Sequence, residues 1–387
     1  MRTRAWLLML LSILALGAVM APLADAKKHH KRGKAAREPK PLVIGHRGAS
    51  GFVPEHTLQS YRLAIKLGAD YVEPDLVMTK DHVLIARHEP ILGDSDPTTT
   101  GDSTNVGDHP EFASRETTRT LDGVPTKGFW AQDFTLAEIK TLGARQTRGG
   151  RPTQFNGQFK IPTFQEIINL VKRESKKRGR RIGIYPETKH PTFHDSQGLS
   201  LEEPLVQTLK KNGLNSKNSP VFIQSFEQSN LKELNHMTRV RLIQLVDAND
   251  TDASGNPTYA PPFDRPYDWT ASGDPTLMSR TFGFFATDAG LDEVKTYADG
   301  IGPWKVYIVP TAGGGGGAIF PPTDLIQRAH ARGLLVHTWT FRDDSFPTGY
   351  PGGPVDEYLN FYKLGIDGVF SDFPDTAFAA REIFRGL

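Results

Sequence analysis

From Pro41 onward, short apolar runs alternate regularly with stretches in which apolar and polar residues recur at helical spacing. A continuous apolar run is typical of a strand buried on both faces, whereas apolar positions three and four residues apart predict a helix with one buried side. Strands are expected at residues 41–45, 71–78, 83–88, 181–185, 221–225, 240–246, 306–309, 334–340 and 368–370. Helices are expected at residues 56–67, 163–178, 201–212, 227–236, 288–298, 324–332, 355–364 and 375–384. Repeated strand–helix units imply a parallel sheet, and about eight of them predict a closed (β/α)8, or TIM, barrel.

Two stretches interrupt this rhythm. Residues 89–158 are rich in Thr, Gly, Asp and Pro and contain one helix-like piece at 136–142. We interpret them as an insertion in an early loop of a barrel domain that spans residues 41–387. Residues 247–281 form a second loop-rich stretch between an expected strand and an expected helix.

Five consecutive glycines, Gly313–Gly317, invite comparison with phosphate-binding loops. The Gly-Lys-Ser/Thr ending of a P-loop does not follow them, so this kind of site is excluded. Two interpretations stay open: a loop at the barrel mouth that moves over a bound substrate, and a plain linker.

The N-terminal residues have the pattern of an export signal. Two arginines precede an apolar run that starts at Ala5, and the small-x-small triplet Ala24-Asp25-Ala26 follows it. This predicts a signal peptide at residues 1–26 and a periplasmic or secreted protein. The alternative is a membrane anchor, for which the run is short, because the hydrocarbon core of a bilayer is about 30 Å thick. The chain has no cysteine, so an exported form depends on a large hydrophobic core without disulfides.

Residues 27–40 contain seven Lys or Arg against one Glu and show no apolar periodicity. We predict a basic disordered tail, either a solvated linker or a segment that attaches weakly to anionic surfaces. Without residues 1–40 the chain keeps 37 Lys and Arg against 42 Asp and Glu, a net charge of −5 in place of +2. A basic face for nucleic acid is therefore not indicated. The 38% hydrophobic and 23% charged residues are typical of a soluble globular protein.

Polar residues recur at the carboxyl ends of the expected strands, which is where barrel enzymes carry their active sites. Those that we single out are His46, Arg47, Glu73, Asp75, His88, Glu187, Lys189, Gln224 and Trp339. Packing alone does not explain polar residues at similar positions on so many separate strands.

Three of these residues are carboxylates. Glu73 and Asp75 are two positions apart on one strand, so they point to the same side and their repulsion needs compensation. A divalent cation supplies it, and hard oxygen ligands favour Ca²⁺ or Mg²⁺, with Glu187 as a third carboxylate from a distant strand. The alternative is that these carboxylates form salt bridges with Arg47 and Lys189.

His46 and His88 also have two interpretations. A lone histidine at a strand end is usually a hydrogen-bonded structural residue. Two histidines beside a carboxylate cluster can instead divide the work of general base and general acid, since imidazole titrates close to neutral pH. Arg47 and Lys189 would then bind an anionic group such as a phosphate.

The order and spacing of several short motifs resemble those of the glycerophosphodiester phosphodiesterase family, in particular its periplasmic or secreted branch. The motifs are His46-Arg47-Gly48, Pro54-Glu55-His56-Thr57-Leu58, Glu73-x-Asp75 with Leu76-Val77-Met78-Thr79-Lys80-Asp81, His88, Tyr185-Pro186-Glu187-Thr188-Lys189, Gln224-Ser225-Phe226, and Asp367-Gly368-Val369-Phe370-Ser371-Asp372-Phe373-Pro374. The resemblance extends from Pro41 to the C-terminus. Each motif is weak alone, but their order and spacing together are specific.

This resemblance implies a TIM barrel of the phospholipase C-like phosphodiesterase type. It implies hydrolysis of small glycerophosphodiesters, such as glycerophosphocholine, to glycerol 3-phosphate and an alcohol. Its catalytic pair would be His46 and His88, and a divalent cation, Ca²⁺ before Mg²⁺, would be held by Glu73, Asp75 and Glu187. The substrate-binding residues that it implies are Arg47, Glu55, Lys189, Gln224, Phe226 and Trp339.

The chain departs from the family pattern at two positions. Glu89 follows His88 where the family usually has Asp, and the extra methylene affects how the imidazole is oriented. Pro74 removes a backbone donor between Glu73 and Asp75, which predicts a local irregularity in that strand. Two other functions stay open: a phospholipase-type phosphodiesterase that acts on intact lipids, and a non-catalytic extracytoplasmic protein that binds glycerol phosphate compounds.

Overall fold

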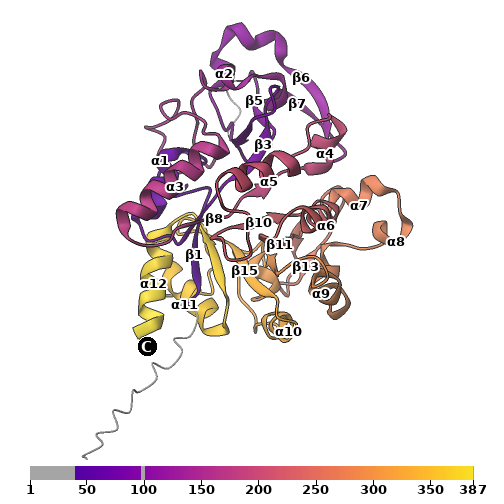
Figure 1. The fold of residues 1–387 in the computed structure, drawn as a ribbon. Helices are drawn as coiled ribbons and strands as arrows, with labels where there is room; N and C mark the ends of the chain where they lie inside the picture. The colour runs from indigo at the N-terminus through magenta and orange to yellow at the C-terminus, as the bar shows by residue number, and fades with distance from the viewer. Residues whose placement is uncertain (1–39, 97–100, 387) are drawn as a thin grey trace, which may run out of the picture. The chain divides into compact units, whose positions relative to one another are not determined.

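Parallel strands form a closed barrel in the computed structural model, which describes residues 40–96 and 101–386 (Figure 1). The barrel strands are β1 (Leu42–His46), β2 (Tyr71–Glu73) with β3 (Asp75–Met78), β8 (Gly183–Ile184) with β9 (Glu187–Thr188), β10 (Phe222–Ser225), β11 (Arg241–Val246), β14 (Gly300–Pro303), β15 (Leu335–Phe341) and β16 (Gly368–Ser371). Each pairs in parallel with the next one along the chain, and β16 pairs with β1, which closes the ring. The predicted TIM-barrel fold is confirmed.

Two of the barrel strands are each divided by a proline. Pro74 lies between β2 and β3, and Pro186 lies between β8 and β9. Neither residue can donate a backbone hydrogen bond. The ladder nevertheless continues, because Tyr185 N donates to Val72 O and Glu187 N donates to Pro74 O, both at 2.9 Å. The irregularity predicted at Pro74 is therefore present, in the middle of the acidic motif.

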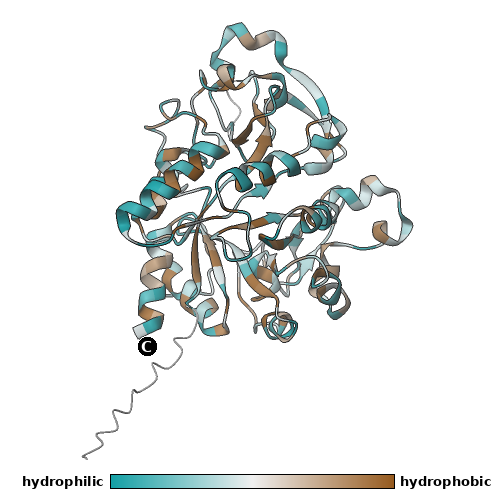
Figure 2. Ribbon diagram, in the orientation of Figure 1, coloured by the Kyte–Doolittle hydropathy of each residue, from teal (hydrophilic) through white to brown (hydrophobic). Residues whose placement is uncertain are grey.

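Helices cover the outside of the barrel. The longer ones are α1 (Leu58–Lys66), α3 (Phe164–Arg178), α5 (Glu202–Lys211), α6 (Gln228–Met237), α9 (Asp288–Val294), α10 (Leu325–Ala331), α11 (Pro354–Leu364) and α12 (Pro374–Gly386). In Figure 2 several of them are two-toned, because their apolar sides pack on the barrel and their polar sides face outward. Among the described residues, no helix is both long and apolar enough to cross a membrane.

The ends of the helices follow local sequence signals. Thr57 accepts a hydrogen bond from Ser60 N at the start of α1, and Thr163 and Glu166 form a capping box at the start of α3. Gly179 ends α3 in the left-handed conformation, with a φ of 60°. Because such signals are local, the helix ranges predicted from sequence agree with the observed ones to within a few residues.

The interior of the barrel is filled by apolar and aromatic side chains. Ile44, Tyr185, Phe222, Ile243 and Phe370 form one buried cluster there. The rings of Tyr185 and Phe222 are stacked, with their centroids 4.9 Å apart. A filled interior is not a channel, so polar chemistry is confined to the end of the barrel where the strands finish.

The stretch that we interpreted as an insertion contains a second sheet. Its antiparallel strands are, in spatial order, β5 (Ile91–Gly93), β7 (Val124–Trp130) and β6 (Thr117–Leu121). With the short helix α2 (Leu136–Ile139) they form the group at the top of Figure 1. Phe112, Phe129 and Phe134 belong to the small core beneath this sheet. The strands were not predicted because β6 is largely exposed, β5 has only three residues and only the end of β7 is buried, so none of them shows a long buried apolar run.

The predicted position of one barrel strand, residues 306–309, is wrong. Residues Lys305–Tyr307 form the 3-10 turn η5, and the strand at this place in the barrel is β14, Gly300–Pro303. Glycine and proline are poor strand formers, which concealed β14 in the sequence. The glycine is nevertheless required, because a Cβ at Gly300 would lie 2.5 Å from Leu335 O of the neighbouring strand.

Two further stretches differ from expectation. Within residues 83–88, only β4 (Leu84–Ala86) forms, and it pairs antiparallel with β3 instead of joining the parallel ring. The loop-rich stretch 247–281 contains the hairpin β12 (Asp250–Thr251) and β13 (Pro257–Thr258) and the short helices α7 (Tyr267–Ser272) and α8 (Pro275–Met278). These short elements lack the periodicity on which the sequence-based prediction depends.

Candidate active site

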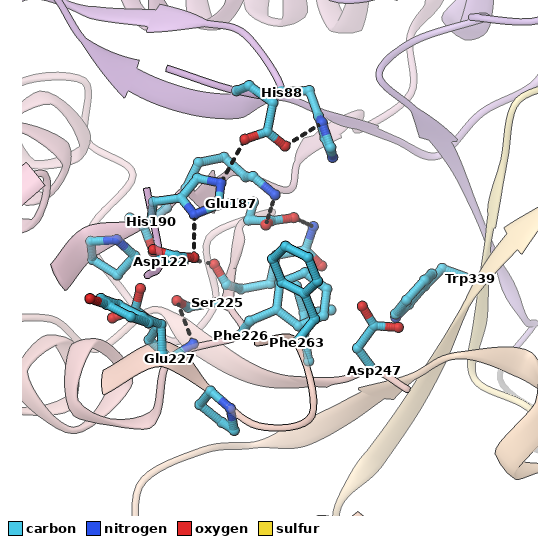
Figure 3. A pocket seen from close by; sticks show the side chains of 18 of the residues that line it. His88, Asp122, Glu187, His190, Ser225, Phe226, Glu227, Asp247, Phe263 and Trp339 are labelled. Carbon is cyan, nitrogen blue, oxygen red and sulfur yellow. Dashed lines mark hydrogen bonds and ion pairs between the residues drawn. The ribbon is translucent and has the colours of Figure 1, made fainter. Parts of the chain in front are cut away.

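A cavity of about 310 Å³ opens where the barrel strands finish (Figure 3). Nine of the predicted site residues line it: His46, Arg47, Glu73, His88, Glu187, Lys189, Gln224, Phe226 and Trp339. The other two, Glu55 and Asp75, are buried next to Arg47 without lining the cavity. The structure therefore brings all the predicted site residues to one place.

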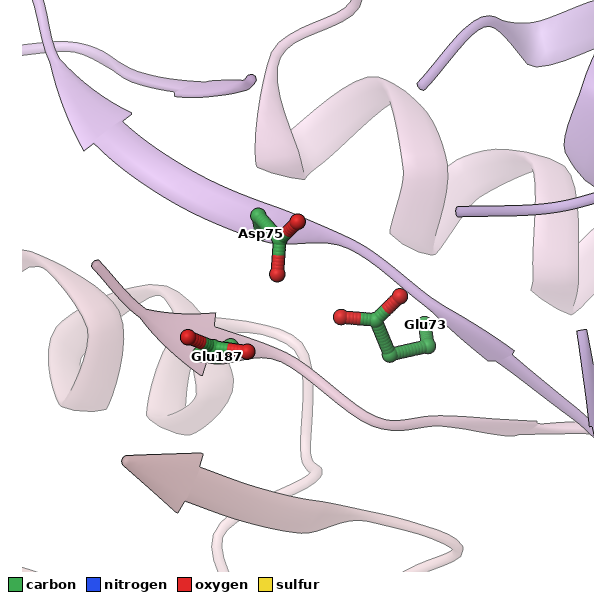
Figure 4. A group of neighbouring side chains, drawn as sticks. All are labelled: Glu73, Asp75 and Glu187. Carbon is green, nitrogen blue, oxygen red and sulfur yellow. The ribbon is translucent and has the colours of Figure 1, made fainter. Parts of the chain in front are cut away.

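Three buried carboxylates, those of Glu73, Asp75 and Glu187, lie close together beside this cavity, and Glu73 and Glu187 line it (Figure 4). One oxygen of each lies within 4.8 Å of the others. Burial, together with the neighbouring Asp75, raises the pKa of Glu73 well above its ordinary value and that of Glu187 to about 8. Like charges at this distance are unfavourable in a buried place unless positive charge joins them.

Two side-chain cations already lie beside the cluster. Arg47 Nη1 is 3.1 Å from Glu55 Oε2, and Arg47 Nε is 3.4 Å from Asp75 Oδ2. Lys189 Nζ is 3.1 Å from Glu187 Oε1. The salt bridges of the alternative interpretation are thus present. They are compatible with a ligand, because Arg47 and Lys189 both border the cavity and can contact an anion there.

The oxygen atoms around the cluster suit a hard divalent cation. Carboxylate and amide oxygens are the protein ligands of Ca²⁺ and Mg²⁺. Gln224 contributes an amide whose Nε2 lies 3.3 Å from Glu73 Oε1, and its buried Oε1 has no hydrogen-bond partner. The buried triad of Glu73, Asp75 and Glu187 can therefore bind a divalent metal ion.

His56 holds the cluster in place, although the sequence analysis assigned it no role. Its Nε2 lies 2.9 Å from Asp75 Oδ2 and its Nδ1 lies 2.8 Å from the Tyr61 hydroxyl. Burial lowers the pKa of His56 to about 4, even though Asp75 acts in the opposite direction. The neutral ring then donates to Asp75 from Nε2 and accepts from Tyr61 at Nδ1, which fixes the Asp75 carboxylate.

His46 is held by a buried carboxylate. Its Nδ1 lies 2.6 Å from Asp372 Oδ1. The other oxygen of Asp372 accepts hydrogen bonds from Arg151 Nη2 at 2.6 Å and Arg342 Nε at 2.9 Å. Burial and the adjacent Arg47 lower the pKa of His46 to about 4 against the influence of Asp372. The ring is therefore neutral near pH 7, and its Nε2 is not used by the hydrogen bond to Asp372.

His88 lies in the loop that follows β4 and is bound in the same manner. Its Nδ1 lies 2.9 Å from Glu89 Oε1. Burial, Arg47 and Lys189 lower the pKa of His88 below its ordinary value. Both histidines thus engage a carboxylate through Nδ1 and leave Nε2 for another partner.

Aromatic side chains form one wall of the cavity. The rings of Phe226 and Trp339 meet edge to face with their centroids 5.8 Å apart, and Trp339 Nε1 donates to Gly302 O at 2.7 Å. Lys189 Nζ lies 5.6 Å from the centre of the Phe226 ring. Phe263 lies at the same cavity and is 53% exposed. This wall is apolar and firmly packed, so it can shape the space for a small organic group.

The glycine run Gly313–Gly317 does not line the cavity. Gly314 N donates to Thr251 Oγ1 and Thr348 N donates to Gly316 O, both at 3.1 Å. These contacts connect the run to loops on either side. The interpretation as a loop that moves over a substrate stays a prediction without support from the cavity.

Some residues of the site were not predicted from the sequence. Asp372 directly follows β16 and Asp247 directly follows β11, so the argument from strand ends that selected His46 would also have found them. Burial raises the pKa of Asp247, which lines the cavity, to about 6. Arg151 reaches Asp372 from the expected insertion, and no local pattern in the sequence marks it.

A closed barrel with acid–base groups, cations and an acidic triad at the carboxyl ends of its strands is the arrangement of an enzyme. The family model described as "Glycerophosphoryl diester phosphodiesterase family" matches residues 46–376. The chain belongs to this family, as the sequence motifs predicted.

Curated relatives agree with this assignment. The chain is 35% identical over 395 residues to a glycerophosphodiester phosphodiesterase of Arabidopsis thaliana, a match that covers 97% of this chain and 96% of that protein. It is 30% identical to a glycerophosphodiester phosphodiesterase of Haemophilus influenzae, over 98% of this chain and 100% of the other. The protein is therefore a phosphoric diester hydrolase of the glycerophosphodiester phosphodiesterase type.

Solved structures show the same fold. A phosphodiesterase from Oleispira antarctica, in complex with the product sn-glycerol-3-phosphate, has a TM-score of 0.57 at 20% sequence identity. The match covers 89% of this chain and 97% of that one. A second structure, from Silicibacter pomeroyi, has a TM-score of 0.57 at 19% identity, over 90% of this chain and 95% of that one.

Proposed function

We propose that this protein hydrolyses small glycerophosphodiesters, such as glycerophosphocholine, to glycerol 3-phosphate and an alcohol, with a divalent cation. The observation that carries the proposal is the meeting of an acidic triad, two side-chain cations and two carboxylate-bound histidines around one cavity. The names of the relatives and the product in the Oleispira antarctica structure support the same substrate class.

Arg47 and Lys189 bind the phosphodiester in this proposal. The planar guanidinium and the ammonium group pair with phosphate oxygens and reduce the negative charge that repels an incoming nucleophile. Glu73, Asp75 and Glu187 would hold the divalent cation, which supplies Lewis-acid stabilisation of the phosphate charge. Glu55 and Gln224 keep Arg47 and Glu73 oriented toward the cavity.

His46 and His88 carry out the two proton transfers of the reaction in this proposal. One imidazole removes the proton from the attacking oxygen, which belongs to water or to the substrate's own glycerol hydroxyl. A new bond forms between this oxygen and phosphorus while the bond to the departing alcohol oxygen breaks. The other histidine enters this step as an imidazolium, a form that the bound phosphate anion favours, and gives its Nε2 proton to that alcohol. When the glycerol hydroxyl attacks, the product is a cyclic phosphate, which water then opens to glycerol 3-phosphate with the two histidines in exchanged roles. Both rings are suited to this work because each has Nδ1 bound to a carboxylate and Nε2 left for the substrate.

Phe226 and Trp339 line the side of the cavity where we place the glycerol or the leaving alcohol. Their packed rings exclude water from that side and restrict the size of the group. The exposed Phe263 at the same cavity favours the alternative substrate, an intact lipid, because an exposed aromatic ring can enter the surface of a bilayer.

Export stays a prediction of the sequence. The expected signal peptide, residues 1–26, and the basic tail, residues 27–40, lie outside the described residues except for Lys40. We propose that the enzyme acts in the periplasm or outside the cell, and that the tail attaches it weakly to anionic surfaces. A mature protein that begins at Lys27 is the expected result of N-terminal sequencing, and retention of Met1 on the exported chain would contradict cleavage.

The substrate is tested by comparing glycerophosphocholine in solution with vesicles of intact phosphatidylcholine. We expect the released glycerol 3-phosphate to show faster turnover of the soluble diester, because the cavity is small and lined by charged groups. Faster release of choline or of phosphorylated headgroup from vesicles would favour the phospholipase. Tight binding of the soluble diester without any turnover would favour the non-catalytic binding protein.

A further inference from the structure

A chain of hydrogen bonds extends beyond His88 to residues that have no role in the mechanism described so far (Figure 3). Glu89 Oε1 contacts His88 Nδ1 at 2.9 Å, and Glu89 Oε2 contacts His190 Nε2 at 2.8 Å. His190 Nδ1 lies 2.7 Å from Asp122 Oδ2. The chain joins three distant segments: the loop after β4, the residue before helix α4 (Pro191–Ser196), and the turn between β6 and β7.

Two members of the chain have unusual backbone conformations. His190 has a φ of 46° and Asp122 a φ of 48°, a region that residues other than glycine rarely adopt. Such conformations cost free energy and persist where the surrounding structure enforces them, which happens most often at functional sites. Here the two strained residues are the ones whose side chains meet.

The charges within the chain are complementary. Both ring nitrogens of His190 face a carboxylate, and both can donate only when the ring is an imidazolium. Although burial acts against it, Glu89 and Asp122 raise the pKa of His190 to about 10. Burial opposes ionisation of Glu89, but the His190 cation, together with hydrogen bonding by both imidazoles, holds the pKa of this carboxyl well below its ordinary value. Glu89 is therefore a carboxylate held between two imidazoles.

The other candidate catalytic histidine has the same kind of support. His46 is bound by Asp372, whose second oxygen is held by Arg151 and Arg342. In both places a carboxylate orients an imidazole and a cation orients the carboxylate. Glutamate has one more rotatable bond than aspartate, so the carboxylate beside His88 needs this second contact to keep one position.

We propose that His190 and Asp122 are positioning residues for His88. They fix the Glu89 carboxylate, and through it the tautomer and direction of the His88 ring, so that Nε2 faces the reacting phosphate. The turn between β6 and β7, outside the barrel, thereby contributes to the catalytic step. This inference rests on the proposed phosphodiesterase function and on the role of His88 in it.

The experiment compares kcat and KM for glycerophosphocholine in Asp122→Asn, His190→Asn and Glu89→Gln variants. Asn is suited to both strained positions because it tolerates the left-handed conformation. We expect kcat to fall about tenfold in Asp122→Asn, with KM unchanged, as is typical when the partner of an orienting group is lost. The control is Lys127→Ala on β7, an exposed residue that should leave both constants unchanged.

A double variant distinguishes positioning from direct contact. Because Asp122 acts through Glu89, Asp122→Asn in a Glu89→Gln background should cause no further loss of kcat. The proposal would be overturned if the losses of kcat multiply in the double variant. It would also be overturned if Asp122→Asn alone changes only KM or leaves kcat unchanged. These residues border the cavity, and an effect on KM alone would mean that they contact substrate instead.

Nitrogen NMR of the histidine rings tests the same inference without turnover. In the wild-type protein we expect a neutral His88 ring with the proton on Nδ1 and a doubly protonated His190 ring, and in Asp122→Asn a mixture of His88 tautomers. An identical His88 signal in both proteins would refute the positioning role. Absence of hydrolysis by the wild-type protein would count against the proposed function, while the ring signals would still decide how His88 is held.

Discussion

Hydrolysis of glycerophosphocholine is expected to slow by about 10²- to 10⁴-fold in kcat when His46 is replaced by alanine, the range that general acid–base catalysis contributes. The cavity loses the imidazole whose Nδ1 is bound to Asp372 and whose Nε2 is left to exchange a proton. Arg47 and Lys189 remain, so the substrate still binds and KM should change little. Release of glycerol 3-phosphate at saturating substrate measures the effect.

A matched control for His46→Ala is His236→Ala, which replaces an exposed histidine on α6. It should retain wild-type kcat, and both variants should unfold cooperatively.

The pH dependence of wild-type kcat/KM gives a second check on the role of the histidines. Burial lowers the pKa of His46 and of His88, so the neutral base persists below the ordinary histidine pKa of about 6.5. The decline of kcat/KM on the acidic side should therefore lie below that pH. In the mutagenesis experiment, a wild-type kcat in His46→Ala would remove this residue from the mechanism.

Removal of divalent cations by a chelator is expected to lower hydrolysis by about 100-fold or more, since a bound cation typically supplies several kcal/mol of transition-state stabilisation. Without it, Glu73, Asp75 and Glu187 repel the anionic substrate as well as one another. Adding back Ca²⁺ or Mg²⁺ should restore activity, and the ion that restores it at the lower concentration identifies the preferred metal.

Glu187→Gln separates a metal effect from other effects of the chelator. This variant loses one carboxylate of the triad, so it should need a higher cation concentration for the same activity. The melting temperature gives a readout besides turnover, because an ion that binds only the folded state raises the Tm of the wild-type protein. A smaller rise is expected for Glu187→Gln. Full activity of the wild-type protein in chelator would remove the metal from the mechanism.

The candidate site could be predicted from the sequence because barrel topology brings strand ends together. His46, Glu73, Glu187 and Gln224 are far apart in the chain, yet all lie at or near the carboxyl end of a strand. Short motifs at those ends then identify the chemistry. This argument is sensitive only to residues at the ends of the expected barrel strands, which is why Arg151 and Asp122, both in the expected insertion, were missed.

Strand prediction failed where local propensity and packing disagree. The strand β14 consists of Gly300, Ile301, Gly302 and Pro303, a sequence with few strand formers. Its glycines are selected by the neighbouring strands, since a Cβ at Gly302 would lie 2.7 Å from Leu245 Cδ2. Such a requirement comes from residues distant in the sequence and leaves no local pattern.

The sequence by itself determined the barrel, the positions of most helices, the acidic triad and the two histidines, because these depend on apolar periodicity and on motifs at strand ends. Only the tertiary structure decided how these groups are held. It joined His46 to Asp372 and the two arginines, and it joined His88 through Glu89 to His190 and Asp122. Glu89 follows His88 directly in the chain, but each of the other partners acts through a hydrogen bond between segments that only folding brings into contact.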